Sequence, residues 1–229
     1  RSRGLGDVYK RQDMGMKIKV CGIAEAVNAA RVANLAPDYM GFIFHPSSPR
    51  NCFGLSPEVV RGLPEEITRV GVFVNRSEDE ITCRCAEYGI ATVQLHGDES
   101  PRLCHSLQTK GFTVWKAIGI DGSLDWGTLD SYVGAVGRFI FDTKSLAHGG
   151  TGVKYDWQLL RFYNLDIPFM LSGGITPDDV AVIKAFAHPM FSGVDVNSRF
   201  ETSPGIKNIN LLHNFIEELR TYEQNTTAL

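Results

Sequence analysis

The stretch MGFIFHPSSPR at residues 40–50 decides the fold, because it joins a short apolar run to a polar loop. An amphipathic segment opened by Ser56-Pro57 follows it, and a second apolar run, RVGVFV, comes at 69–74. Uninterrupted apolar runs of this length are typical of strands that are buried on both faces, as the strands of parallel sheets are. The same unit of apolar run, polar or glycine-rich loop and amphipathic segment recurs from Lys17 onward.

Eight of these runs are predicted to be strands. They cover Ile18–Cys21, Tyr39–Phe44, Thr68–Phe73, Thr92–Leu95, Thr113–Ile118, Phe139–Asp142, Phe169–Ser172 and Phe191–Val196. Eight strand-and-helix units leave two α/β architectures, a closed barrel or an open doubly wound sheet. We expect a single-domain (β/α)8 TIM barrel over residues 16–229, because a doubly wound sheet rarely needs eight regular units and such barrels take about 200 to 250 residues.

Local chemistry marks the expected helix starts. Three helices should begin at a capping residue followed by proline, at Ser56-Pro57, Ser100-Pro101 and Thr176-Pro177. Ser77 and Glu80 have the spacing of a capping box. The last helix is predicted from apolar residues at helical spacing between Ile209 and Leu219. The fifth unit, GTLDSYVGAVG at 127–137, contains interior glycines and predicts only a short helix.

The first residues, RSRGLGDVYKRQ, differ in composition from the rest of the chain. They are mostly basic and polar, and they lack the apolar segment of a secretory signal. We therefore expect residues 1–15 to be a non-native or disordered leader, with the natural start at Met14 or Met16, and we expect the barrel not to need it.

Composition narrows the function classes. The formal net charge of -3 argues against a nucleic-acid partner, which usually calls for a basic patch. No apolar run approaches the roughly 20 residues of a membrane helix. The five cysteines are irregularly spaced, which predicts reduced thiols in the cytoplasm rather than disulfides. Cys83 and Cys85 should point to different faces of one helix, so a metal site is not expected.

The active site of such a barrel lies at the carboxyl ends of its strands, so the residues there are the candidates. The predicted strands or the loops after them carry Cys21, Arg50, His96, Asp142, Asp195 and Asn197-Ser198. Three other histidines, His105, His188 and His213, fall on or near outer helices and are expected to face solvent.

Two loops suggest that the chain binds a phosphate group. Gly173 and Gly174 follow the seventh strand and precede a predicted helix, so their backbone N–H groups suit a phosphate group. Asn197 and Ser198 follow the eighth strand, at the second place where barrels of this type hold phosphate. The third loop, GGTG at 149–152, lacks the lysine and hydroxyl residue of a P-loop and is expected to form a mobile lid.

Taken together and in order, these segments resemble the phosphoribosylanthranilate isomerase family over roughly residues 16–223. The fragments that carry the resemblance are KVCGI (19–23), GFIFHPSSPR (41–50), VGVFVN (70–75), VQLHGDE (93–99), FDTK (141–144), GGTG (149–152), LSGGI (171–175), GVDVNSRFE (193–201) and PGIK (204–207). LSGGI alone is found in many phosphate-binding barrels, but the ordered set is specific.

The resemblance implies an Amadori rearrangement of a small phosphosugar, N-(5-phosphoribosyl)anthranilate, in tryptophan biosynthesis, without metal or organic cofactor. It implies that Cys21 is the general base and Asp142 the general acid. It also implies that Arg50 holds the anthranilate carboxylate, that Asp195 binds the sugar hydroxyls and that His96 lines the site. We expect a monomer or a homodimer.

The chemistry sets conditions on the two catalytic groups. A proton donor must stay partly neutral near pH 7, which asks for a desolvated carboxyl group at Asp142. A thiol has a pKa of about 8.5, so Cys21 is expected to need a modestly lowered pKa to act as a base.

Two other functions remain open at this point. The chain could be a histidine-pathway or bifunctional phosphosugar isomerase, although those enzymes carry a carboxylate where this chain has Cys21. It could also be a barrel that binds phosphosugars without catalysis, although Cys21, Asp142 and Arg50 are all present.

Overall fold

The computed structural model of the chain describes residues 15–143 and 155–226. The predicted leader, apart from its last residue, and the predicted lid at 149–152 lie outside these ranges. Both therefore stay predictions.

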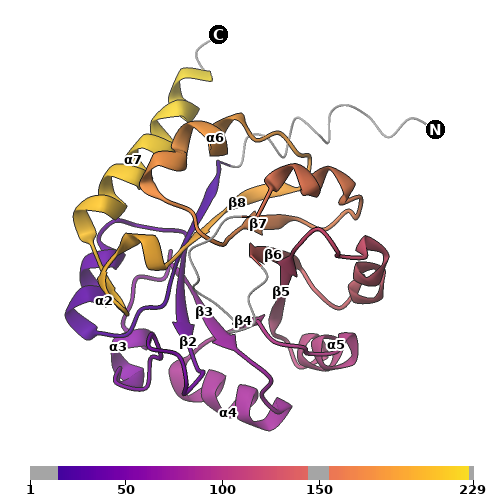
Figure 1. Cartoon of the computed structure of the whole chain (residues 1–229). Helices are drawn as coiled ribbons and strands as arrows, with labels where there is room; N and C mark the ends of the chain where they lie inside the picture. The colour runs from indigo at the N-terminus through magenta and orange to yellow at the C-terminus, as the bar shows by residue number, and fades with distance from the viewer. Residues whose placement is uncertain (1–14, 144–154, 227–229) are drawn as a thin grey trace.

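Eight parallel strands close into one barrel in sequence order, which confirms the expected architecture (Figure 1). The strands are β1 (Lys17–Cys21), β2 (Tyr39–Ile43), β3 (Thr68–Phe73), β4 (Thr92–Leu95), β5 (Thr113–Ile120), β6 (Arg138–Thr143), β7 (Phe169–Leu171) and β8 (Phe191–Val196). β8 pairs with β1, with Asp195 opposite Lys19, and this pairing closes the ring. Each predicted strand boundary lies within two residues of the observed one.

Helices surround the ring of strands (Figure 1). The α-helices are α2 (Ala26–Ala33), α3 (Pro57–Arg61), α4 (Glu78–Tyr88), α5 (Pro101–Thr109), α6 (Val180–Ala185) and α7 (Ile209–Thr226). The 3₁₀-helices are η1 (Trp126–Tyr132), η2 (Trp157–Phe162), η3 (Pro177–Asp179) and η4 (Ser198–Phe200). The fifth unit forms only η1, as its glycines predict. A short hairpin, β9 (Glu201–Ser203) and β10 (Ile206–Lys207), follows β8 and was not expected, because strands of two or three residues leave no periodic pattern.

The helix caps follow the sequence in part. Ser77 and Glu80 form the predicted capping box, and Ser100 accepts a hydrogen bond from the backbone N of Leu103 at 3.3 Å. The five-residue helix α3 begins at Pro57 as predicted, but the Ser56 side chain makes no capping hydrogen bond, so that part of the prediction is wrong. At the start of η3, the backbone N of Thr176 donates a hydrogen bond to the Asp179 carboxylate at 2.6 Å.

Apolar residues fill both sides of the barrel wall. Inward-facing Val70, Trp115, Ala117, Ile140 and Met170 form a cluster of their own inside the ring, separate from the larger core between strands and helices. Burial on both faces is what the continuous apolar runs indicate. The carboxyl ends of the strands are left for polar side chains.

His188 departs from the expectation that it faces solvent. It is half-buried, its ring packs 5.0 Å from the Phe169 ring, and its Nδ1 accepts a hydrogen bond from the backbone N of Met190 at 3.1 Å. A loop beyond α6 turns it inward, which helical spacing does not reveal. His105 and His213 are exposed, as expected.

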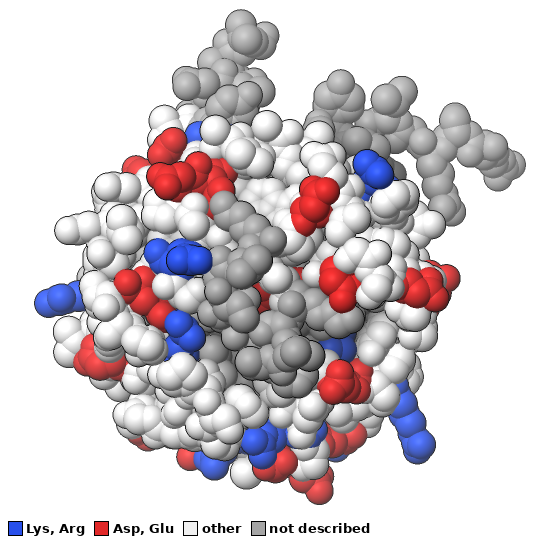
Figure 2. Space-filling view, in the orientation of Figure 1, with Lys and Arg blue, Asp and Glu red and all other residues white. Residues whose placement is uncertain are grey.

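The surface gives no sign of a polyanion partner on the face that Figure 2 shows, where acidic and basic side chains are interspersed. Among the helices that the structure describes, none has the length and apolar character needed to cross a bilayer.

The two cysteines of α4 point to different faces, as predicted, since Cys83 is exposed and Cys85 is buried. Burial raises the pKa of the Cys85 thiol to about 12, whereas a thiol in an unfolded chain has a pKa of about 8.5. Between these values the unfolded chain loses the proton that the folded chain keeps. The stability that the neutral thiol provides is therefore full below pH 8.5 and is lost as the pH rises.

We expect this one thiol to lower the free energy of unfolding by about 1 to 2 kcal/mol between about pH 8.5 and pH 10, since one pKa unit is worth about 1.4 kcal/mol. Urea unfolding at both pH values measures it. Cys85→Ala should lose this share of the pH dependence, and Cys83→Ala, on the same helix, should keep it. Identical pH dependence in the two variants would contradict the assignment.

Candidate active site

Cys21 ends strand β1 with its thiol inside the barrel wall, and the residue is only 5% exposed. Gly41 is its register partner on β2. A Cβ atom at Gly41 would lie 2.7 Å from the Cys21 Sγ, so a glycine is needed there to make room for the thiol. The space around Cys21 is thus set by two neighbouring strands.

Lys19 lies two residues before Cys21 and faces the same way, because side chains alternate along a strand. Its side chain is fully buried, and its Nζ donates a hydrogen bond to Asp195 Oδ2 at 2.8 Å. Burial works to lower the pKa of Lys19, but Asp195 and Cys21 together raise it, so the amine keeps its charge. The sequence reasoning missed Lys19, although strict alternation from Cys21 would have found it.

The environment of the Cys21 thiol differs from the expectation of a lowered pKa. Burial raises the pKa of Cys21, and the Lys19 and Lys207 cations only partly oppose this, while Asp195 adds to it. The expectation was wrong in sign because it came from what the reaction requires of a base, and the depth at which the barrel buries the thiol is not revealed by sequence.

Asp142 and His96 meet across the mouth of the barrel. His96 Nε2 lies 3.3 Å from Asp142 Oδ2, and both side chains are mostly buried. On the other side of the imidazole ring, Nδ1 lies 2.9 Å from the Gln94 amide nitrogen. His96 therefore lies in direct contact with Asp142, and Gln94 fixes its ring.

Asp195 connects these groups. Its carboxylate is buried, and the pKa is raised by burial, against the opposing effect of Lys19; Asp142 raises it further and His96 lowers it. Asp195 Oδ1 has no hydrogen-bond partner among the described residues, so it can accept a donor from a ligand. The structure thus brings Cys21, Asp142, His96 and Asp195 into one electrostatic cluster at the carboxyl ends of the strands.

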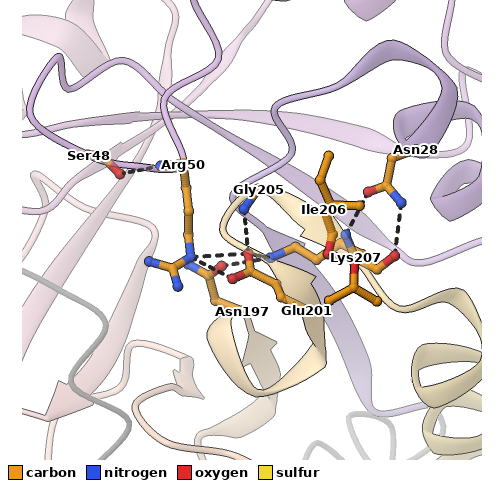
Figure 3. A network of polar contacts seen from close by, with 9 residues as sticks. Asn28, Ser48, Arg50, Asn197, Glu201, Gly205, Ile206 and Lys207 are labelled. Atoms are coloured by element: carbon orange, nitrogen blue, oxygen red, sulfur yellow. Dashed lines mark hydrogen bonds and ion pairs between the residues drawn. The ribbon is translucent and has the colours of Figure 1, made fainter.

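Arg50 approaches this cluster from the loop after β2. A Cβ at Gly22 would lie 3.1 Å from Arg50 Cδ and 2.7 Å from Asn197 Oδ1, so both side chains lie next to the residue that follows Cys21. The Arg50 Nε donates to both carboxylate oxygens of Glu201, at 3.1 and 2.9 Å (Figure 3). Glu201 and its partner Lys207 were missed as site residues, although both lie in fragments that carry the family resemblance.

The predicted phosphate-binding residues lie at the ends of two adjacent strands, β7 and β8. Gly173 and Gly174 both adopt left-handed backbone conformations, with φ of 83° and 68°. Asn197 and Ser198 begin the short helix η4 after β8, and Asn197 Oδ1 accepts a hydrogen bond from Lys207 Nζ at 2.7 Å. The structure therefore brings the two loops together next to the polar cluster.

A thiol and a carboxyl group in one buried site can move protons between atoms of a bound substrate. Nearby, a guanidinium and the backbone N–H groups of two loops can hold the anionic groups of such a substrate. Within residues 15–143 and 155–226, no cluster of three or more metal-ligating side chains occurs.

Comparisons with known proteins agree with this arrangement. A family model described as N-(5'-phosphoribosyl)anthranilate isomerase matches residues 18–218. The N-(5'-phosphoribosyl)anthranilate isomerase of Parabacteroides distasonis is 41% identical over 206 residues, which cover 89% of this chain and 93% of the relative.

Two solved structures are similar as well. One shows monomers generated from the dimeric phosphoribosylanthranilate isomerase of Thermotoga maritima, with a TM-score of 0.73 and 31% identity over 90% of this chain and 98% of the other. The second is a phosphoribosylanthranilate isomerase in complex with reduced 1-(o-carboxyphenylamino)-1-deoxyribulose 5-phosphate. Its TM-score is 0.75, with 30% identity over 90% of this chain and 99% of that chain.

Proposed function

The chain belongs to the N-(5'-phosphoribosyl)anthranilate isomerase family, and we propose that it carries out the family's reaction with Cys21 as general base and Asp142 as general acid. The enzyme isomerises N-(5'-phosphoribosyl)anthranilate to 1-(o-carboxyphenylamino)-1-deoxyribulose 5-phosphate in tryptophan biosynthesis. One observation carries the assignment. Both Cys21 and Asp142 interact electrostatically with the same buried carboxylate, Asp195, so one small substrate can reach both.

In the proposed mechanism Asp142 gives its proton to the furanose ring oxygen. The C1′–O bond breaks, and the anilino nitrogen supplies the electron pair that makes the open-chain iminium. Cys21, in its thiolate form, then takes the proton from C2′, and the electrons of that C–H bond neutralise the iminium to an enolamine. Tautomerisation of the enolamine gives the ketone.

The raised pKa of Cys21 fits this order of events. Only the thiolate of Cys21 can accept the C2′ proton, and a cation close to the buried thiol favours its ionisation, with the thiol proton passing to the carboxylate that Asp142 has become. The iminium is such a cation, and it exists only after Asp142 has opened the ring. Lys19, beneath the thiol, adds a second positive charge.

The remaining groups hold the substrate. Asp195 Oδ1, which has no hydrogen-bond partner among the described residues, accepts a hydrogen bond from a sugar hydroxyl. His96 holds the Asp142 carboxyl group in place. The backbone donors of Gly173, Gly174 and Ser198, with the Asn197 side chain, take the phosphate. We propose a cytosolic enzyme, a setting that suits its five free thiols, acting as a monomer or, like the Thermotoga maritima enzyme, a homodimer.

The terminal nitrogens of Arg50 bind the anthranilate carboxylate in this proposal. Arg50→Lys keeps the charge but loses the planar fork. Losing one hydrogen bond to a charged group costs about 1.5 to 3 kcal/mol, so we expect KM to rise about tenfold or more while kcat changes little.

The assay follows the fluorescence of freshly generated substrate as the enzyme consumes it. Wild-type protein without turnover in this assay would contradict the proposed function. An unchanged KM for Arg50→Lys would show that the substrate carboxylate binds at another place.

A further inference from the structure

The Glu201 carboxylate, at the start of β9, lies at the centre of a buried polar network (Figure 3). Its side chain is 4% exposed. Besides the two bonds from Arg50 Nε, it accepts from Lys207 Nζ at 2.6 Å and from the backbone N of Gly205 at 3.1 Å. Four hydrogen bonds to one carboxylate leave it little freedom.

Lys207 fixes the other side of Glu201. Its side chain is fully buried, and its Nζ bridges Glu201 and Asn197. Its backbone is held by Asn28 of α2, whose amide donates to the Lys207 O at 2.9 Å and accepts from the Lys207 N at 2.8 Å. The network is therefore anchored in the body of the barrel and does not depend on mobile surface side chains.

The orientation of Arg50 follows from these contacts. The Ser48 Oγ accepts from its backbone N at 3.1 Å, and Glu201 holds Nε. The terminal nitrogens have no protein acceptor within the described part of the chain, and in Figure 3 they point away from Glu201. Because Nε is occupied, the guanidinium can offer a carboxylate only its end-on pair of terminal NH2 groups.

We infer that Glu201, supported by Lys207, is a positioning residue that fixes the Arg50 guanidinium so that its two terminal nitrogens receive the substrate carboxylate. This rests on the proposed role of Arg50. Arg50, Lys207 and Glu201 together carry one net positive charge, which matches one carboxylate. Glu201 acts on specificity for the anthranilate carboxylate and takes no part in the proton transfers.

Two ligands test this. One is the reduced 1-(o-carboxyphenylamino)-1-deoxyribulose 5-phosphate, and the second is the same compound without its carboxylate. For Glu201→Gln, calorimetry should show about tenfold weaker binding of the first ligand and less than about twofold change for the second. KM should rise with kcat nearly unchanged. A carboxylate that acted only through its charge would give the opposite result, since its removal would tighten binding of the anionic ligand.

Glu201→Asp keeps the charge but shortens the side chain, and it should show a smaller loss of the same kind, which covers the case that Glu201→Gln does not fold. Glu99→Gln is the matched control. The Glu99 side chain is also buried, at 1% exposed, and it accepts from the backbone N of Asn75 and of Gly97 at 2.8 Å each, with neither a hydrogen bond nor an ion pair to Arg50 within the described residues. Glu99→Gln should lower the free energy of unfolding but should not change the affinity for one ligand more than for the other.

Arg50→Lys tests the role of Arg50 separately from the positioning role of Glu201. If it binds both ligands as wild type does, the proposed role of Arg50 fails. If Arg50→Lys discriminates between the ligands and both Glu201 variants do not, the role of Arg50 stands and the positioning role of Glu201 is overturned.

Discussion

Cys21→Ala and Asp142→Asn should each lower turnover by about 10²- to 10⁴-fold, the usual worth of a positioned proton-transfer group. Both variants should fold, because each side chain ends at the mouth of the barrel and each substitution removes or replaces few atoms. Binding of the reduced product analogue should change little, since its phosphate and carboxylate are held elsewhere. A loss in kcat with unchanged binding marks an interaction made mainly in the transition state.

Substrate deuterated at C2′ distinguishes the two variants. Without Cys21 the iminium can still form but keeps its C2′ proton, so proton abstraction limits the rate and the isotope effect should be large. Without Asp142 ring opening limits the rate, and the isotope effect should be small. Near-wild-type turnover in one variant would show that its residue takes no part in proton transfer. Near-wild-type turnover in both variants would contradict the proposed mechanism.

Lys19→Met should lower the free energy of unfolding by about 3 to 5 kcal/mol, because it leaves a buried carboxylate without its counter-charge. Lys19 and Asp195 have side chains that are 0% and 5% exposed, and their charged atoms lie 2.8 Å apart. Urea unfolding near pH 7 measures the loss. The double variant Lys19→Met with Asp195→Asn should recover part of it, since no buried charge then remains unpaired.

Lys17→Met is the matched control on the same strand. Lys17 also lies 2.8 Å from a carboxylate, that of Asp38, but these side chains are 33% and 21% exposed. An ion pair open to water is worth about 0 to 1 kcal/mol. Equal losses for Lys17→Met and Lys19→Met would show that burial does not set the strength of the inner pair.

The local sequence predicts the barrel and the strand-end positions of Cys21 and Asp142, for a physical reason. Apolar runs and caps depend on neighbours in the chain, and the end of a strand tells where Cys21 and Asp142 lie. Lys19 and Glu201 were missed because their partners are distant in sequence, 176 residues away for Lys19 with Asp195 and 151 for Glu201 with Arg50. The sign of the Cys21 pKa shift was missed for a related reason, since it depends on burial by the whole barrel.

The pairing of β8 with β1 also bears on how the chain reaches its fold during synthesis. The first strand leaves the ribosome with Lys19, and Asp195 is added 176 residues later. Until then β1 is an open sheet edge, and its lysine has no buried counter-ion. Local units can form early, but contacts between such distant residues form slowly, because a long loop must close first. Ring closure is therefore expected late in folding, and an incomplete nascent chain exposes the edges on which aggregation begins.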